Sequence, residues 1–344
     1  MASDLGKKRP TIGLLGDNLY FPYSILVHQS VSKVVAEQNA DLFYFAGSSL
    51  ASHLEFRGQG NIVFELIRKE RFDGLLVVSS LLGGFIGHAG ITQFCQQYSP
   101  LPIVSLGHEI EAIPSVIIDN RQGVFDAVSH LIEGHGCRRI AWIHGPENSQ
   151  EAQARFSGYT EALTEHGISI DPNLLVPGDF QWESGVRAIH TFLDKRHLRL
   201  GIDIDAIVAG NDNMALSAVE TLQKRGIVVP DDVKIVGFDN NPETSIGAPN
   251  LTTVHQPFEQ MGRVAAELLL SMLNGETSPP RIAMPAQLII RQSCGCPQEL
   301  SKAATPSTIA TSPVTPTQPT LKAPNQSLSV LIEAGMNTSI WQDA

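Results

Sequence analysis

Residues 206–258 constrain the fold more than any other stretch of the sequence. They contain two short apolar runs, Ala206–Ala209 and 233–238, each followed by carboxamide or carboxylate residues. Between these runs, apolar side chains at helical spacing in 214–225 predict a helix, and Gly226 follows where a helix C-cap is expected. A strand–helix–strand unit of this kind forms a parallel pair with a right-handed crossover.

Polar residues follow both predicted strands. Asn211 and Asp212 come after the first strand, and Asp239 and Asn240 come after the second. Ligands of open parallel sheets bind beyond the carboxyl ends of the strands, so we expect a binding site here. Asp212 fits the N-cap of the following helix better than a chemical role. Asp239 also suits a tight turn, but its pairing with Asn211 at a neighbouring strand end favours ligand contact.

The same alternation runs through most of the chain. Strands are predicted at 11–16, 41–45, 74–78, 102–106, 140–144, 174–177 and 288–290, besides the two runs above. Helices are predicted at 25–38, 61–69, 91–98, 123–133, 152–166, 184–193 and 257–274. Alternating strands and helices indicate an α/β fold. A chain of 344 residues is long enough for two such lobes, with a cleft between them.

Composition excludes several kinds of protein. The formal net charge is −11 and no run of Lys or Arg exceeds three residues, which argues against a nonspecific nucleic-acid surface. Four cysteines are too few for a disulfide framework, and the N-terminus lacks the features of a signal peptide. Residues 74–108 carry no Asp, Glu, Lys or Arg, but Gly, Ser, Gln and Pro interrupt them below the length of a membrane span. We therefore expect a cytoplasmic protein with no membrane partner.

Three segments resemble the effector-binding core of LacI/GalR-type transcription regulators: 155–163 (RFSGYTEAL), 209–240 and 251–262 (LTTVHQPFEQMG). Residues 117–146 are similar to the same family. The resemblance covers about residues 11–293. It implies the periplasmic-binding-protein type I fold, with two Rossmann-like lobes of parallel sheets joined by three crossover strands, which close on a ligand by hinge bending.

The resemblance also implies domain boundaries. The N-terminal lobe is expected to comprise 11–118 and 257–276, and the C-terminal lobe 119–256 and 277–297, after an N-terminal tail of ten residues. Residues 298–327 are rich in Ser, Thr and Pro, which is typical of a flexible linker. Residues 328–344 are expected to be a tail or the start of an output segment.

The family resemblance implies a role for nine positions in ligand binding. Hydroxyl-bearing ligands need planar donors and acceptors together with an aromatic face, and these positions supply both. The implied ligand-binding residues are Arg155, Asn211, Asp239, Gln256, Phe258, Phe180, Asp17, Asn18 and Phe21. The expected ligand is a small polar effector, a sugar or related metabolite, and no cofactor is expected.

Two departures from the family pattern bear on signalling. Only ten residues precede Thr11, too few for the family's helix-turn-helix, so we expect no direct DNA binding by this chain. Residues 291–297 (RQSCGCP) resemble an ending found where such a core precedes a histidine kinase or diguanylate cyclase. The alternatives are therefore a sensor for such an output domain and a regulator that acts on DNA through a partner or lost domain. By resemblance, the helix at 25–38 is expected in a homodimer interface.

No catalytic or metal-binding motif is recognised. Cys294 and Cys296 are interpreted as a local thiol pair, because no further Cys or His at metal-site spacing follows. His130 and His135 do not form the H-E-x-x-H motif, and His135 is interpreted as a helix C-cap. The glycine-rich 83–90 lacks a phosphate-loop pattern, and no G-x-S-x-G occurs. An enzyme is thus the less favoured alternative.

Overall fold

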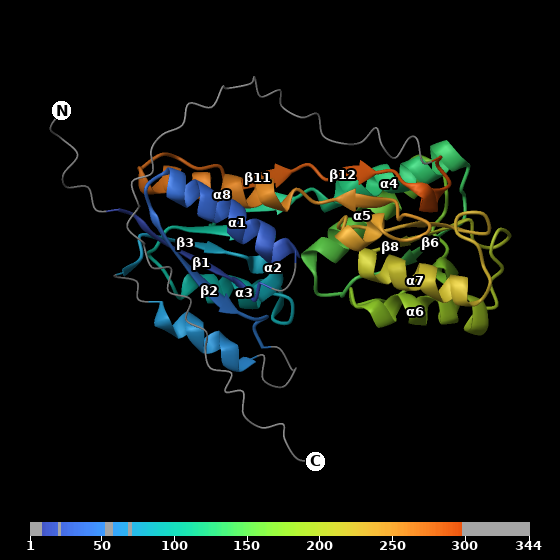
Figure 1. The fold of residues 1–344 in the computed structure, drawn as a ribbon, viewed down its shortest axis with the longest axis horizontal. Coiled ribbons are helices and arrows are strands. Elements are labelled where there is room, and N and C mark those ends of the chain that lie inside the picture. The colour runs from blue at the N-terminus through green and yellow to red at the C-terminus, as the bar shows by residue number, and fades with distance from the viewer. Residues whose placement is uncertain (1–8, 20–21, 52–57, 68–70, 298–344) are drawn as a thin grey trace, which may run out of the picture. The chain divides into compact units, whose positions relative to one another are not determined.

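The computed structural model describes residues 9–19, 22–51, 58–67 and 71–297. These residues form two α/β lobes, drawn at the left and right of Figure 1. The α/β class with parallel sheets predicted from the sequence is confirmed. No helix among these residues is long and apolar enough to cross a membrane.

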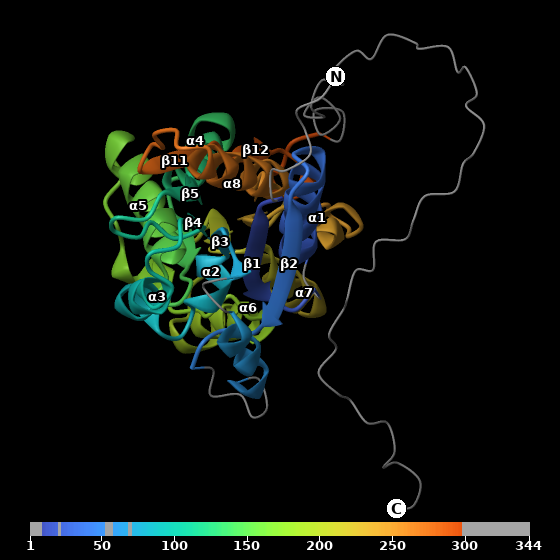
Figure 2. The same cartoon turned by 90° about the vertical axis from the view of Figure 1, so that its left-hand side faces the viewer.

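The first lobe is built on a six-stranded parallel sheet in the order β11-β5-β4-β3-β1-β2. Its strands are β1 (Thr11–Asp17), β2 (Asp41–Gly47), β3 (Gly74–Val77), β4 (Ile103–Leu106), β5 (Ser115–Ile118) and β11 (Arg281–Met284). Its helices are α1 (Pro22–Glu37), the 3₁₀ helix η1 (Gly58–Leu66), α2 (Ser79–Leu82), α3 (Gly87–Gln96) and α8 (Phe258–Leu273). Helix α1 packs beside α8, as Figure 2 shows.

The second lobe contains a four-stranded parallel sheet in the order β7-β6-β8-β9. Its strands are β6 (Ile140–Ile143), β7 (Leu175–Val176), β8 (Ala206–Ala209) and β9 (Lys234–Val236). Its helices are α4 (Asn120–His135), α5 (Gln150–Glu165), α6 (Trp182–His190) with a π turn at Thr191–Lys195, and α7 (Asp212–Lys224), with short 3₁₀ turns at Pro172–Leu174 and Pro242–Ser245. The predicted parallel pairing of β8 with β9 is confirmed.

Side-chain alternation along these strands explains why both faces of the second sheet are covered. Trp142 and Val208 point into the core shared with α4 and α5, whereas Ile143 and Ile207 point into the core shared with α6 and α7. Strands buried on both faces consist of continuous apolar residues. This is why the apolar runs of the second sheet show no alternation of apolar and polar residues.

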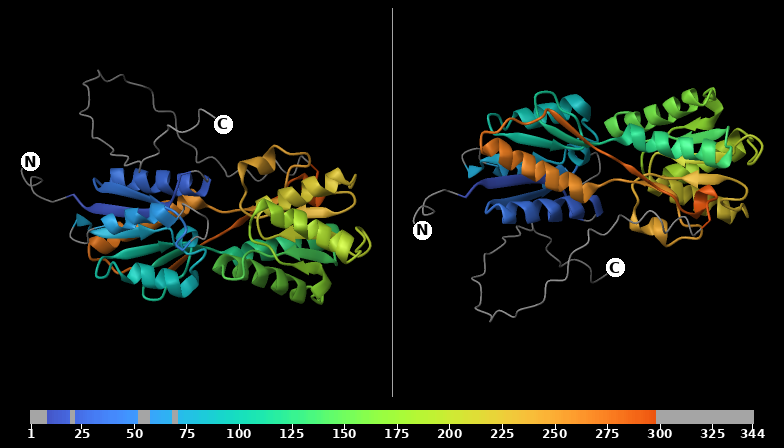
Figure 3. Two further views of the ribbon diagram at one scale, coloured as in Figure 1. Left: turned by 90° about the horizontal axis from the view of Figure 1, so that it is seen from below. Right: turned by 90° about the horizontal axis from the view of Figure 1, so that it is seen from above.

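Three connections cross between the lobes: β5 to α4, β10 (Thr253–His255) to α8, and β11 to β12 (Gln287–Ile289). Figure 3 shows them as neighbouring segments, and β10 pairs with β12 in antiparallel fashion. One boundary expected from the sequence is wrong. The family resemblance places residues 277–297 wholly in the C-terminal lobe, but β11 pairs with β5 in the first lobe's sheet.

Candidate functional site

A cavity of about 520 Å³ lies where the two lobes face each other. It is lined from the first lobe by Tyr23, Ser80 and Met261 among others, and from the second by Arg155, Asn211 and Asp239 among others. The volume is in the range of small-molecule sites. We refer to it as the interlobe cavity.

Arg155 is the buried cation of this cavity. It comes from the second turn of α5, which begins after the N-cap Ser149, and only 5% of the residue is exposed. Its Nε donates to Asn120 Oδ1 at 2.8 Å and its Nη1 donates to the Gly210 carbonyl at 2.7 Å. The guanidinium also lies over the ring of Phe238, 3.8 Å from its centroid. These contacts hold the cation in one orientation, as a preformed binding site requires.

Asp239 faces this guanidinium, with 3.6 Å between its Oδ1 and Arg155 Nη1. The same oxygen accepts a 2.6 Å hydrogen bond from Gln256 Nε2, which comes from the β10–α8 crossing. Burial raises the pKa of Asp239 to about 6, against the opposing effects of Arg155 and Gln256. Its φ of 128° is one that non-glycine residues rarely adopt, and such backbone strain is concentrated at functional sites.

Asn211, not Asp212, caps α7. The Asn211 Oδ1 accepts from the Met214 backbone N–H, and its Nδ2 donates to the Phe180 carbonyl at 3.0 Å. The N-cap predicted for Asp212 is therefore wrong by one residue. An amide has two acceptor lone pairs and two donor hydrogens, so Asn211 retains one of each for a ligand.

Aromatic rings line both sides of the cavity. Tyr23 and Phe258 stack with centroids 4.2 Å apart, and Tyr23 Oη shares a 2.8 Å hydrogen bond with Ser80 Oγ. From the second lobe, the Phe180 ring lies 5.3 Å from the Arg155 guanidinium. Flat apolar faces of this kind pack against the C–H side of a polar ligand.

A contact between His108 and Glu151 joins the lobes beside the cavity. His108, from the loop after β4, shares a 3.0 Å contact with Glu151 Oε2 in the first turn of α5. Burial alone would raise the pKa of Glu151, but the hydrogen bond and charge of His108, together with a backbone hydrogen bond and the charge of Arg155, lower that pKa overall. The Ser149 hydroxyl also donates to Glu151, at 3.0 Å. Closing or opening the lobes would make or break this pair.

The structure places six of the nine residues expected from the sequence on the cavity wall: Arg155, Phe180, Asn211, Asp239, Gln256 and Phe258. Asp17 and Asn18, at and after the end of β1, are not among its lining residues, and Phe21 lies outside the described residues.

The sequence reasoning missed several lining residues. Among them are Tyr23, Ser80, Asn120, Glu151, Asn213, Asn241 and Glu243. Asn120 could have been found, because it follows the Ile117-Ile118 run as Asn211 follows β8. Tyr23 and Ser80 carry no such signal.

Asp212, which lies beside the site, makes the stability of the fold depend on pH. It is fully buried and accepts hydrogen bonds from Thr253 Oγ1 (2.6 Å) and the Asn241 N–H (2.8 Å). Burial, with the charge of Asp239, raises the pKa of Asp212 from its ordinary 3.8 to about 7. The folded protein thus holds a proton that the unfolded chain releases, so this stability is present at low pH and is lost as the pH rises from about 4 to about 7.

We expect Asp212→Asn to remove this contribution. Urea unfolding of both proteins at several pH values measures it. The free energy of unfolding of the wild type, minus that of Asp212→Asn, should fall as the pH rises from about 4 to about 7. Other titrating groups contribute equally to both proteins and cancel in this difference. Parallel stability curves from pH 4 to pH 8 would show that Asp212 does not titrate there.

The geometry defines a class of protein: a two-lobed α/β ligand-binding protein with its cavity at the hinge. A family model for a periplasmic binding protein-like domain matches residues 128–294. The HTH-type transcriptional regulator CelR of Thermobifida fusca is 35% identical over 287 residues, covering 77% of this chain and 81% of the relative. The transcriptional repressor CytR of Escherichia coli K12 is 35% identical over 240 residues, covering 68% of this chain and 66% of the relative.

Solved structures agree. A CelR–cellobiose complex superimposes with a TM-score of 0.68 and 30% identity over 83% of this chain and 85% of that chain. A regulatory protein of the LacI family from Chloroflexus aggregans superimposes with a TM-score of 0.70 and 28% sequence identity. The match covers 82% of this chain and 98% of that chain. The chain belongs to the LacI family of transcription regulators and contains that family's effector-binding fold.

Proposed function

We propose that the interlobe cavity binds a small, uncharged polyhydroxy effector of the sugar or nucleoside class, and that binding shifts the balance between open and closed lobes. The observation that carries this proposal is the juxtaposition of Arg155, Asp239 and Gln256 with the Tyr23–Phe258 stack. It joins fixed donors and acceptors to an aromatic face. The cellobiose complex of CelR supports the same chemical class.

The charge of the cavity favours neutral over anionic effectors. Among the described residues, three carboxylates line it (Glu151, Asp239 and Glu243), against the single guanidinium of Arg155. Carboxylates accept hydrogen bonds from hydroxyls but repel phosphate. A phosphorylated sugar would therefore bind more weakly than its neutral parent.

The proposed role is noncatalytic. An effector drives the conformational change only to the extent that it binds one lobe arrangement more tightly than the other, and residues from both lobes are present to supply that difference. The homodimer, the cytoplasmic location and signalling to an output segment or partner belong to the same proposal. These three proposals rest on the membership of the chain in the LacI family.

A thermal-shift panel of neutral sugars, nucleosides and sugar phosphates tests the choice of ligand class. At about 100 times its Kd, a neutral effector should raise the Tm by roughly 5–10 °C, because the linkage energy is then about 2.7 kcal/mol. Its phosphorylated form should give a smaller shift. Stabilisation by phosphates alone would contradict the assignment, and turnover of the bound compound would favour an enzyme instead.

A further inference from the structure

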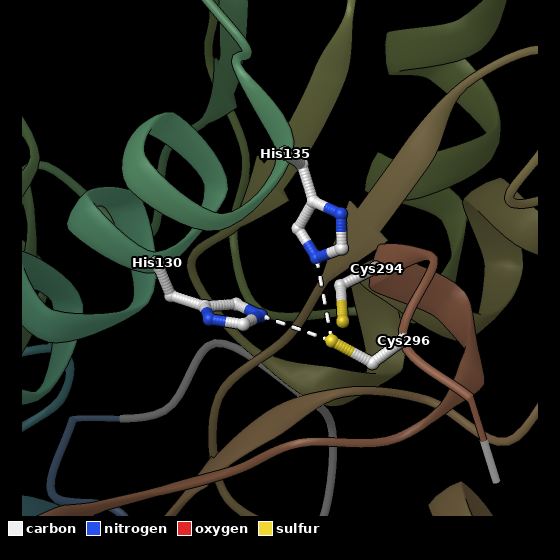
Figure 4. Close-up of side chains that lie close together, drawn as sticks. All are labelled: His130, His135, Cys294 and Cys296. Atoms are coloured by element: carbon white, nitrogen blue, oxygen red, sulfur yellow. Dashed lines mark hydrogen bonds between the residues drawn. The ribbon is translucent and has the colours of Figure 1, made fainter. Parts of the chain in front are cut away.

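Four metal-binding side chains converge on one point of the second lobe, away from the interlobe cavity. They are His130 and His135 from α4, and Cys294 and Cys296 from the segment that follows β12, and we call them the His/Cys cluster. One ligand atom from each lies within 4.8 Å of the other three. Figure 4 shows both imidazoles directed at the two sulfurs.

The spacings within the His/Cys cluster match a tetrahedral metal site. The Cys296 Sγ lies 3.6 Å from His130 Nε2 and 3.4 Å from His135 Nε2. A tetrahedral zinc ion, with Zn–S of about 2.3 Å and Zn–N of about 2.0–2.1 Å, separates sulfur from nitrogen by about 3.6 Å. Its other ligand pairs are about 3.3–3.8 Å apart, so the widest spacing in the cluster needs to contract by about 1–1.5 Å.

The fold holds both halves of the cluster in place. His130 and His135 occupy the last turns of α4, which ends at Gly136 in a left-handed conformation. Cys294 ends the 3₁₀ turn η6 (Gln292–Cys294), and Gly295, at φ 98°, turns the chain so that Cys296 faces the same point.

Ser293 anchors the cysteine segment to the sheet. Its hydroxyl donates to the Ile235 carbonyl at 2.6 Å, and its backbone N–H donates to the Asn250 carbonyl at 3.0 Å. The two cysteines are therefore presented by a fixed turn. They are free thiols in the structure, and Cys294 is fully buried.

We propose that the His/Cys cluster is a structural zinc site of the Cys₂His₂ type. Two thiolates and two neutral imidazoles form a closed tetrahedral set that leaves no position for substrate, which is typical of structural rather than catalytic zinc. Thiolate and imidazole donors also select zinc over magnesium, calcium or manganese. Two thiolates neutralise the ion, so the bound site carries no net charge.

The site would tie residues 292–296 to the C-terminal end of α4. The N-terminal end of the same helix carries Asn120, which lines the interlobe cavity and accepts a hydrogen bond from Arg155. Zinc would thus fix the segment after the last strand to the helix that contacts the effector cavity. The interpretation of Cys294 and Cys296 as a local thiol pair, drawn from their spacing alone, gives way to this one.

Cobalt substitution tests the proposal on the full chain. Reduced protein is stripped with a chelator, titrated with Co²⁺ and then with Zn²⁺. We expect the visible d–d bands of tetrahedral cobalt with a thiolate-to-metal charge-transfer band, saturation at one ion per chain, and displacement by one equivalent of zinc. Zinc should also raise the Tm of the stripped protein, because it binds the folded state.

Matched variants assign the ligands. Cys296→Ser and His135→Gln should lose the tetrahedral spectrum and the zinc-induced rise in Tm. Cys95→Ala, which removes a buried thiol of the first lobe, and His166→Gln, which removes a surface imidazole bonded to Glu133, should retain both. Because the wild-type titration is itself decisive, a variant that fails to fold does not affect the test.

Two results would overturn the proposal. One is reduced wild-type protein that gives neither a tetrahedral cobalt spectrum nor stabilisation by zinc. The other is formation of a Cys294–Cys296 disulfide by a cluster that binds no metal ion. Effector binding is measured separately, so its failure would leave the zinc result unaffected.

Discussion

Replacement of Arg155 by Met is expected to lower the free energy of unfolding by about 3–5 kcal/mol and to abolish effector-induced stabilisation. Removing one partner of a buried ion pair leaves the other charge uncompensated, which accounts for this magnitude. Here the substitution also leaves Asn120 Oδ1 and the Gly210 carbonyl without their donor. Urea unfolding and a thermal-shift assay with the best ligand measure the two effects.

The loss should depend on pH, because Arg155 opposes the burial effect that raises the pKa of Asp239. Without the guanidinium this pKa rises further. The folded variant must then keep a proton that the unfolded chain releases, so the loss of stability grows as the pH increases above about 6.

Two variants serve as controls. Arg121→Met, which breaks an exposed pair with Glu161, should change stability little, since exposed ion pairs contribute little. The double variant Arg155→Met/Asp239→Asn should lose less stability than the sum of the losses in the two single variants, because Arg155 and Asp239 interact directly. Additive losses, or retained ligand stabilisation in Arg155→Met, would contradict the pairing of these residues in the site.

Gly158→Ala is expected to have the second large effect, although it touches no ligand. A Cβ at this position of α5 would lie 2.1 Å from the Arg121 carbonyl oxygen and 3.0 Å from the Phe125 nitrogen, so α4 and α5 must move apart. Overpacking of this kind costs about 1–3 kcal/mol and occasionally more. Since α5 carries Arg155 and α4 carries Asn120, effector affinity should fall as well.

Gly134→Ala is the matched control on α4. The nearest atoms to its Cβ belong to the His130 ring at 3.5 Å, an ordinary contact, and alanine favours helix by up to about 1 kcal/mol. We therefore expect unchanged or slightly higher stability. If Gly158→Ala behaved like Gly134→Ala in urea unfolding, the close α4–α5 packing would be wrong.

The sequence predicted much of the fold because buried parallel strands and amphipathic helices have strong local patterns. The run Ala206–Ala209 and the helix that follows it were found in this way. Strands β5, β10 and β11 were not predicted. Each has only three or four residues, and β11 belongs to a sheet whose other strands end about 160 residues earlier, so its partner cannot be inferred from local sequence.

The same limit applies to the sites. Asn211 and Asp239 follow neighbouring strands, so sheet geometry alone brings them to one edge. Asp212 was misjudged as the cap because the exact first residue of a helix is set by backbone geometry. The His/Cys cluster was not recognised, since 161 residues separate His135 from Cys296 and only the folded chain brings the end of α4 beside the segment that follows β12.

Calorimetric titration of one ligand into wild type and Asp239→Ala tests the central claim most directly. The ligand is the neutral compound that gives the largest thermal shift. Loss of a hydrogen bond to a charged group should raise the Kd about 10- to 100-fold. Asp194→Ala, which removes an exposed carboxylate paired with Arg225 outside the cavity, should keep the wild-type Kd. An Asp239→Ala Kd equal to that of the wild type would contradict effector binding between the lobes.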